Sequence, residues 1–341
     1  MKKFLLSLMV LCCALAGKAQ ATTDVPKAIL QHGDQVSAFS GGNAFVQAMT
    51  AAVDGDVITL SNGQFAPAPI NKSVSIYGAG YTNNASTGTT QSTLYGDVFI
   101  GASGDTLCNV HMEGLYINGS LYAGYANNAS TKVPIKGLNV EKCFVQQYMI
   151  MGGYNENLVL KQCVFAYNIN RGLCKNTLFT NCILYGTING YTEDFEILID
   201  HCISTVVAAS NDNGRGITWT NCIFTTNENY TNLVISGTYC VVKNCIKTTR
   251  ARFGTGTSAE NIYEVGAPSE IFADGENASF SASRTWELQQ PDVWIGTDGT
   301  PIGPSGGIGW STVPRVPFIK SLELNVEGQQ LHINYEAEAR D

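Results

Sequence analysis

The stretch Ile217-Thr218-Trp219-Thr220-Asn221-Cys222-Ile223-Phe224, ITWTNCIF, is one copy of a pattern that recurs through the middle of the chain. Six copies align on a cysteine that follows a polar residue and precedes an apolar one. They read LNVEKCFV, LVLKQCVF, TLFTNCIL, ILIDHCIS, ITWTNCIF and CVVKNCIK, with cysteines at Cys143, Cys163, Cys182, Cys202, Cys222 and Cys245. Successive cysteines lie 19 to 23 residues apart, and a repeat of this length is the signature of a solenoid.

Apolar and polar residues alternate before each of these cysteines. In ITWTNCIF the apolar positions are Ile217 and Trp219, which indicates a strand with one buried face. The residue directly before the cysteine is polar in every copy, which suits a bend, and the residue after it is apolar again. A strand, a bend and a short second strand in each repeat predict one coil of a parallel β-helix, which buries its apolar edge only by stacking on its neighbours.

The repeat cysteines are expected to form a buried packing column. Equivalent residues on stacked coils lie about 4.8 Å apart with parallel side chains, whereas a disulfide needs Cβ atoms about 3.8 Å apart that point toward each other. Disulfides that involve Cys174 and Cys240 stay open as an alternative. The sequence contains no C-x-x-C pair, so it predicts no zinc site. At the bends, Asn181, Asn221 and Asn244 are expected to pair with one another and with the backbone along the stack.

The first residues have the three parts of a secretory signal peptide. Lys2 and Lys3 precede the apolar run FLLSLMVLCCALA, and a small-residue exit follows at Ala19-Gln20-Ala21. We therefore expect a secreted protein, located in the periplasm, at the cell surface or outside the cell. No later stretch has eighteen apolar residues in a row, so we expect no membrane insertion. The formal net charge of −8 argues against a nucleic-acid partner.

The coils and three flanking motifs resemble the right-handed parallel β-helix proteins of the pectate-lyase-like superfamily, in particular its secreted bacterial members. The motifs are DGDVITLSNG at 54–63, SIYGAG at 75–80 and DGTPIG at 298–303. The resemblance implies an all-β, single-stranded, right-handed parallel β-helix of about ten coils. An apolar helical stripe before the first motif predicts the helix that caps the N-terminal end of the solenoid in this family.

This reading divides the chain into four regions. They are a signal peptide (1–21), an N-terminal lead-in (22–41), the β-helix (42–310) and a C-terminal strand pair or cap (311–341). The last region contains FIKSLELNV and QQLHINYEA, whose alternation is typical of two strands.

The resemblance implies a protein that binds or cleaves an extracellular polysaccharide, with acidic polymers as the family's usual substrates. Lyases of this family use a basic residue to remove the proton α to a uronate carboxylate, often with Ca²⁺ held by acids. The paired aspartates of the family's hydrolases are missing here. The alternative is a non-catalytic adhesin, glycan-binding protein or structural surface protein, because a fold alone does not determine activity.

Charged residues that precede four consecutive copies of the repeat form the candidate site. If the segments that carry them leave the coils along one edge, they make a mixed-charge rim. For a lyase we assign catalytic roles to Arg215, as the base, and Asp212. Substrate binding is assigned to Glu156, Arg171 and Asp194. No metal ligand is assigned, the cofactor stays unknown, and Ca²⁺ is the ion that a lyase would use. The competing interpretation is an ordinary solvated edge.

Two short segments match motifs of pectate lyases in part. Ile199-Asp200-His201-Cys202 resembles their Trp-Ile-Asp-His, with Leu198 in the place of the tryptophan, but it is also in register with the other rungs. We therefore interpret it as a repeat. Residues 315–320, RVPFIK, resemble their Arg-x-Pro-x-x-Arg but end in lysine and lie beyond the coils, so we assign them no function.

Overall fold

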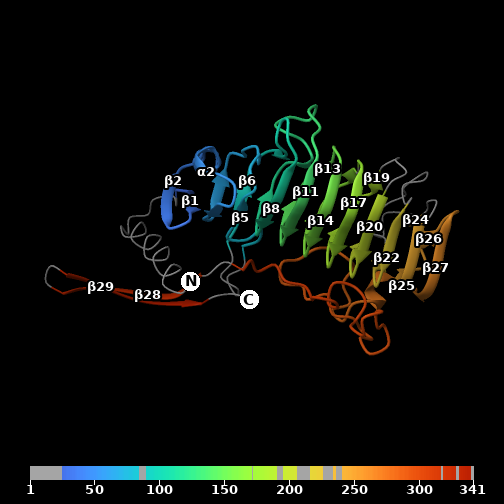
Figure 1. Cartoon of the computed structure of the whole chain (residues 1–341). Helices are drawn as coiled ribbons and strands as arrows, with labels where there is room; N and C mark the ends of the chain where they lie inside the picture. The colour runs from blue at the N-terminus through green and yellow to red at the C-terminus, as the bar shows by residue number, and fades with distance from the viewer. Residues whose placement is uncertain are drawn as a thin grey trace.

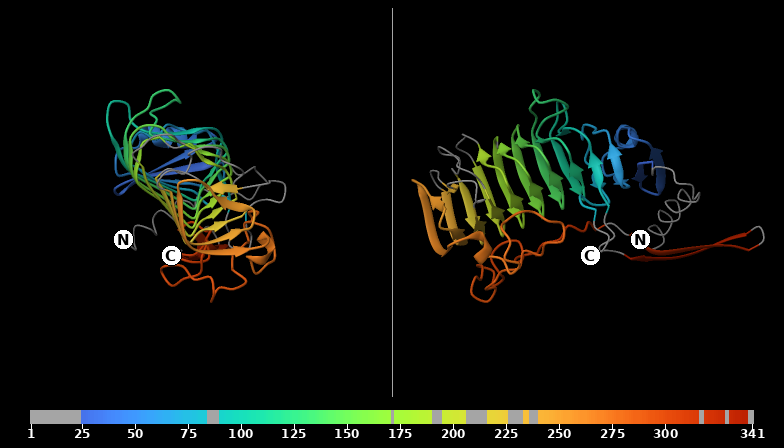
Figure 2. Two further views of the ribbon diagram at one scale, coloured as in Figure 1. Left: turned by 90° about the vertical axis from the view of Figure 1, so that its right-hand side faces the viewer. Right: turned by 180° about the vertical axis from the view of Figure 1, so that it is seen from behind.

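The computed structural model describes residues 25–83, 90–170, 172–189, 195–205, 216–225, 233–235, 240–315, 318–327 and 330–338. These residues form an all-β parallel β-solenoid of about nine turns, close to the ten expected (Figure 1). Seen along its axis, the solenoid has coils stacked around a single interior (Figure 2). None of the helices in these ranges is long and apolar enough to cross a bilayer.

Each coil contributes one longer strand to a parallel ladder, which we call the long-strand ladder. Two antiparallel strands, β1 (Lys27–His32) and β2 (Gln35–Ser40), extend it at the N-terminal end. Its parallel members are β3 (Val57–Leu60), β5 (Ser75–Tyr77), β8 (Leu107–Glu113), β11 (Ile135–Glu141), β14 (Asn155–Lys161), β17 (Cys174–Thr180), β20 (Phe195–Asp200), β22 (Ile217–Thr220), β25 (Cys240–Thr248) and β27 (Thr257–Val265).

Shorter strands complete the coils in two further ladders. The short-strand ladder contains β4 (Gly63–Phe65), β6 (Ser92–Leu94), β9 (Tyr116–Ile117), β12 (Phe144–Val145), β15 (Val164–Phe165), β18 (Ile183–Leu184), β21 (Ile203–Ser204), β23 (Ile223–Phe224) and the second half of β25. The third contains β7 (Val98–Ile100), β10 (Leu121–Ala123), β13 (Met149–Met151), β16 (Ile169–Asn170) and β19 (Ile188–Asn189), and a separate pair joins β24 (Leu233–Ile235) to β26 (Ala251–Phe253).

The interior is built from the alternating apolar positions of the repeat. In β22, Ile217 and Trp219 are buried while Thr218 and Thr220 are partly exposed. Trp219 meets Phe224 of the next strand edge to face, with 5.1 Å between the ring centroids. The two strands of one coil therefore close on each other through an aromatic contact, as the period-2 pattern predicts.

The six repeat cysteines form the expected packing column. All six are fully buried, and each is a free thiol. Cys174 and Cys240 also form no disulfide, so the alternative of a disulfide at these two positions is wrong. The column adds polar contacts as well, because the backbone N–H of Cys182 donates to the Sγ atom of Cys202 at 3.2 Å.

We expect a thiol-reactive reagent to label the native protein at Cys108 alone among residues 25–315. Cys108 is partly exposed, whereas the other eight cysteines of these residues are buried. Mass spectrometry without reductant should find all nine labelled after unfolding. Unlabelled, linked cysteine pairs in the unfolded sample would contradict the packing column.

A short helix closes the N-terminal end of the solenoid. Helix α2 (Ala44–Ala51) lies beside β1 and β2 (Figure 1). It buries Phe45, Ala48 and Met49 in the same interior cluster as the coils. The helix therefore covers the apolar interior of the first coil at this end of the solenoid.

The residue before each repeat cysteine turns the chain from one strand to the next through a left-handed backbone conformation. The φ angles lie between 48° and 53° at Lys142, Gln162, Asn181, His201, Asn221 and Asn244. Asparagine is among the few residues that visit this conformation readily, which explains its frequency at the bend. Because the bend is this tight, the side chains of these six bend residues point outward along one edge of the solenoid.

After β27 the chain forms no further coil and runs back along the outside of the short-strand ladder (Figures 1 and 2). We call residues 266–315, which include the short helix η1 (Pro268–Glu270), the strap. The strap buries the outward-facing column Val164, Ile183, Ile203, Ile223 and Ile246 under Ile271, Phe272, Trp286, Leu288, Trp294 and Ile302. The short strands are thus buried on both faces, which explains why neighbouring residues such as Cys222 and Ile223 are both apolar.

The region 42–310 defined from the sequence therefore includes most of the strap. Beyond it, β28 (Phe318–Glu327) and β29 (Gln330–Glu338) form an antiparallel hairpin. This hairpin lies at the end of the molecule away from β27 (Figure 1), because the strap returns the chain there first.

Candidate functional site

Of the five site residues predicted from the sequence, Glu156 lies in the described part of the chain. It is partly exposed on the outer face of β14, and its Oε2 atom is 3.5 Å from Nζ of Lys136 on β11. Lys175 of β17 is its register partner on the other side. Arg171, Asp194, Asp212 and Arg215 lie outside the described residues, so their roles stay predictions.

A groove of about 580 Å³ opens on the outer face of the long-strand ladder. Gly216, which lines it, directly follows Arg215, and Glu196 comes two residues after Asp194. Leu198 is 40% exposed in the groove. The lining residues are Asn176, Thr177, Leu178, Glu196, Ile197, Leu198, Gly216 and Thr218.

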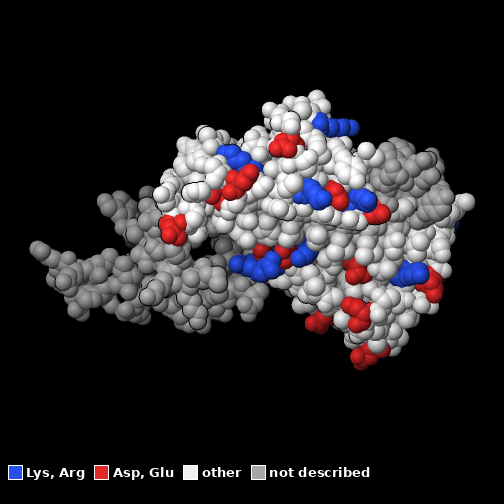
Figure 3. Space-filling view, in the orientation of Figure 1, with Lys and Arg blue, Asp and Glu red and all other residues white. Residues whose placement is uncertain are grey.

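The charges around this groove alternate in sign along the ladder. Lys136, Glu156 and Lys175 occupy one register position on β11, β14 and β17, and Glu196 stands on the next strand, β20. Figure 3 shows basic and acidic side chains interspersed on this face. Opposite charges on neighbouring strands attract one another and leave little net field. The described part of the rim is therefore electrically balanced.

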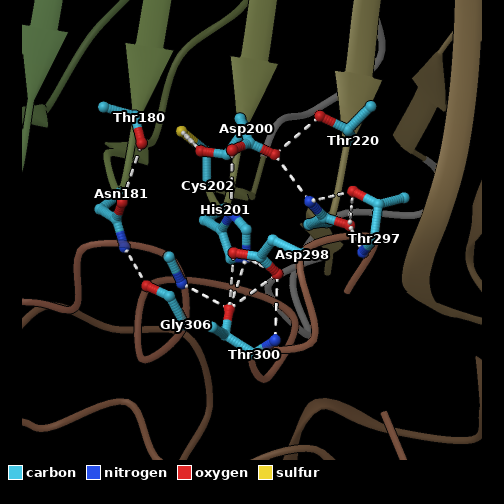
Figure 4. Close-up of polar contacts among 12 residues, drawn as sticks. Thr180, Asn181, Asp200, His201, Cys202, Thr220, Thr297, Asp298, Thr300 and Gly306 are labelled. Carbon is cyan, nitrogen blue, oxygen red and sulfur yellow. Dashed lines mark hydrogen bonds and ion pairs between the residues drawn. The ribbon is translucent and has the colours of Figure 1, made fainter. Parts of the chain in front are cut away.

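The Asp200-His201 pair, interpreted above as a repeat, joins the solenoid to the strap (Figure 4). Nδ1 of His201 is 2.9 Å from Oδ2 of Asp200, and its Nε2 is 3.2 Å from Oγ1 of Thr300 in the strap. Asp298 lies beyond, with its Oδ1 atom 3.5 Å from the same Nε2. His201 is 1% exposed, so this arrangement ties two segments together and leaves the imidazole no access to a substrate.

Hydrogen bonds keep Asp200 ionised at this junction. Burial alone would raise the pKa of its carboxyl group, but hydrogen bonds from His201, Thr220 and Asn221 and the charge of His201 hold the pKa below its usual value. Its Oδ1 atom accepts from Oγ1 of Thr220 at 2.7 Å and from Nδ2 of Asn221 at 2.9 Å. The Asp200 carboxylate thus contacts His201 at its own bend and Thr220 and Asn221 of the neighbouring coil.

The neighbouring bends hold the strap as well. Nε2 of Gln162 donates to the carbonyl of Gly309 at 2.8 Å, and Nδ2 of Asn181 donates to the carbonyls of Pro304 and Gly306. The expectation that the bend asparagines pair along the stack holds for Asn244, whose Oδ1 accepts from Asn261. It is wrong for Asn181, because the strap supplies backbone partners that one sequence does not reveal.

At Asn221 the junction takes both kinds of partner. Its Nδ2 atom donates to Asp200 of the neighbouring coil and, at 3.1 Å, to Oγ1 of Thr297 in the strap. The backbone N–H of Thr297 in turn donates to Oδ1 of Asn221 at 2.8 Å. A single amide therefore satisfies strap and ladder together.

The strap ends at a buried charge network that the sequence did not predict. The backbone N–H of Arg315 donates to Oε1 of Glu113 at 2.7 Å, and its guanidinium pairs with Glu113 and Glu141. Lys142 and His111 lie 3.4 Å from the Glu113 carboxylate, which is fully buried. The sequence led us to assign no function to the segment that begins at Arg315. The structure shows that Arg315 anchors the end of the strap to Glu113 and Glu141.

The same network contains the one group of three potential metal ligands found in the described ranges. Side-chain atoms of His111, Glu113 and Glu141 lie within 4.8 Å of one another. The cations of Lys142 and Arg315 already balance the two carboxylates. A divalent ion would have to displace Arg315 and would then face Lys142, so these residues do not fit the Ca²⁺ that a lyase would use.

Comparison with known proteins identifies no relative, because no protein-family model, curated protein or solved structure matches this chain. The fold and the groove define the class as a parallel β-solenoid with an open groove on its long-strand face. The resemblance to the pectate-lyase-like superfamily rests on the sequence motifs.

Proposed function

We propose that this chain is a secreted polysaccharide-binding solenoid whose ligand lies in the groove across β17, β20 and β22. The groove carries the proposal, because its volume of about 580 Å³ falls in the range of small-ligand sites. Leu178 and Leu198 supply an apolar surface for the C–H face of a sugar ring, while Asn176 and Thr218 supply hydrogen-bonding groups for its hydroxyls. Secretion is supported by the features of residues 1–21.

The charge pattern favours an uncharged glycan over an acidic one. Glu196 is the charged residue of the groove lining, and it would repel a uronate carboxylate. Lys175 on the next strand stands in register with Glu156 and is not among the residues that line the groove. A neutral chain meets no such repulsion.

The second candidate function is cleavage of an acidic polymer by a lyase reaction. The observation that favours it is the position of Gly216 in the groove lining, directly after Arg215. In that reaction Arg215 would take the proton α to the uronate carboxylate, with Asp212, Asp194, Arg171 and Glu156 positioning the chain. A non-catalytic adhesin or surface protein would use the same groove without turnover.

We expect Leu198→Asp to weaken binding of a neutral polysaccharide at least about tenfold, because it puts a charge where an apolar sugar face would lie. The matched control is Val241→Asp, which alters an outward position of β25 that is not among the groove residues. Affinity electrophoresis should be run with neutral glucans, xylans and galactans beside polygalacturonate and alginate. Binding to none of these polymers would contradict the proposal.

The same samples test the lyase reaction. Wild-type protein is incubated with polygalacturonate and alginate, with and without Ca²⁺, while the absorbance of unsaturated products is followed. Product formation that is lost in Arg215→Ala would establish the second candidate. Product formation that is unchanged in this variant would move the base to another residue, and no product from any uronate polymer would eliminate the lyase.

A further inference from the structure

His201 is placed so that its protonation state changes the hydrogen bonds that hold the strap. On one side it faces Asp200 of its own strand, and on the other it faces Thr300 and Asp298 of the strap. The neighbouring bends carry the uncharged Asn181 and Asn221. The imidazole therefore lies between two carboxylates that belong to different segments (Figure 4).

The directions of these hydrogen bonds follow from the donors and acceptors available. An ionised Asp200 only accepts, so Nδ1 of His201 carries a hydrogen whether the ring is charged or neutral. Thr300 has one hydroxyl hydrogen, and its Oγ1 already accepts from the backbone N–H of Gly307 at 2.7 Å. The same Oγ1 is 2.9 Å from both carboxylate oxygens of Asp298.

When His201 is charged, every group in this chain of contacts has a partner. Nε2–H donates to Oγ1 of Thr300, and the Thr300 hydroxyl donates to Asp298. When the ring is neutral, Nε2 has no hydrogen. The Thr300 hydroxyl must then turn either to Nε2, which breaks its bond to Asp298, or to Asp298, which leaves a buried nitrogen without a donor.

We propose that His201 is a proton-operated clasp, which holds the strap when the imidazole is charged and loosens it when the imidazole is neutral. The packing supports a close fit at this point. A Cβ atom at Gly306 would come within 2.8 Å of Cδ2 of His201, so the strap lies directly on the ring. Histidine changes charge in the range of pH 5 to 8, and loosening the strap would uncover the isoleucine column at Ile203 and Ile223.

The other anchors near the clasp do not titrate in this range. Gln162, Asn181 and Asn221 hold the strap with neutral amides. Burial raises the pKa of the neighbouring Cys202 thiol, but hydrogen bonds with Cys182 and Cys222 lower it to about 6. A change of strap stability between pH 5 and pH 8 is therefore assigned to His201 only where His201→Gln removes it.

Hydrogen exchange of residues 296–307, corrected for the intrinsic effect of pH, tests the clasp in the full-length protein. We expect exchange to become at least about tenfold faster from pH 5.5 to pH 8.5, because a hydrogen bond to a charged group is lost. Residues 155–161 of β14 provide the internal control and should not change. Uniform exchange of 296–307 across this pH range would overturn the proposal.

Two variants separate the clasp from general stability. His201→Gln keeps a residue that the equivalent bend already holds at Gln162, and its strap exchange should be independent of pH. Asp298→Asn changes a side chain that is 40% exposed and should reduce the pH response. A His201→Gln protein that keeps the wild-type pH response, or an Asp298→Asn protein with an undiminished one, would show that the clasp lies elsewhere.

Discussion

Replacing Trp219 with alanine is expected to lower the free energy of unfolding by about 3–5 kcal/mol, as for other large aromatic residues in cores. Trp219 is 3% exposed and fills the interior of its coil against Phe224. The surrounding coils hold their spacing through ladder hydrogen bonds, so they cannot collapse into the cavity. Denaturant unfolding, followed by circular dichroism, measures the change.

The matched control lies one residue away. Thr218 stands on the outward side of the same strand, and Thr218→Ala should change the free energy of unfolding by about 0.5 kcal/mol or less. Equal effects of the two substitutions would mean that β22 does not direct Trp219 into the core.

Replacing Arg315 with alanine is expected to lower the free energy of unfolding by about 1–2 kcal/mol, less than the loss of a fully buried partner, because the Arg315 side chain is 45% exposed and water screens its charge. Glu113 and Glu141 would keep one close cation, Lys142, for two carboxylates. The strap would also lose the side-chain contacts of Arg315, which hold its C-terminal end. Lys243→Ala is the control, because Lys243 pairs with Glu260 at 3.4 Å on the surface, where such pairs contribute about 1 kcal/mol or less.

The pH dependence of stability should report the same network. Burial would raise the pKa of Glu113, but His111, the N–H of Arg315 and the charges of Lys142 and Arg315 lower it to about 2. An unfolded glutamate titrates near 4.3, so Glu113 contributes about 3 kcal/mol above that pH, and this contribution is lost as the pH falls toward 2. Arg315→Ala removes the guanidinium charge but keeps the backbone N–H, so the loss of stability should begin at a slightly higher pH than in the wild type. A loss of stability at an unchanged pH would show that the guanidinium does not lower the pKa of Glu113.

Much of the solenoid could be predicted from the repeat, because ladder pairing forces equivalent residues of successive coils into the same environment. Leu158, Ile197 and Ile217 are all buried for this reason, as their period-2 pattern predicts. The candidate site was harder to predict. The residues predicted for it, such as Asp212 and Arg215, follow no repeat, and nothing in their spacing relates them to the groove around Leu198.

By itself the sequence determined the coil, its inward faces and the packing of the cysteine column, since all of these depend on contacts between residues a fixed distance apart in the chain. Only the tertiary structure decided what covers the outer side. Arg315 meets Glu113 across about two hundred residues, and Thr300 meets His201 across about a hundred. Such contacts leave no period in the sequence, because each is made once, between the strap and a single coil.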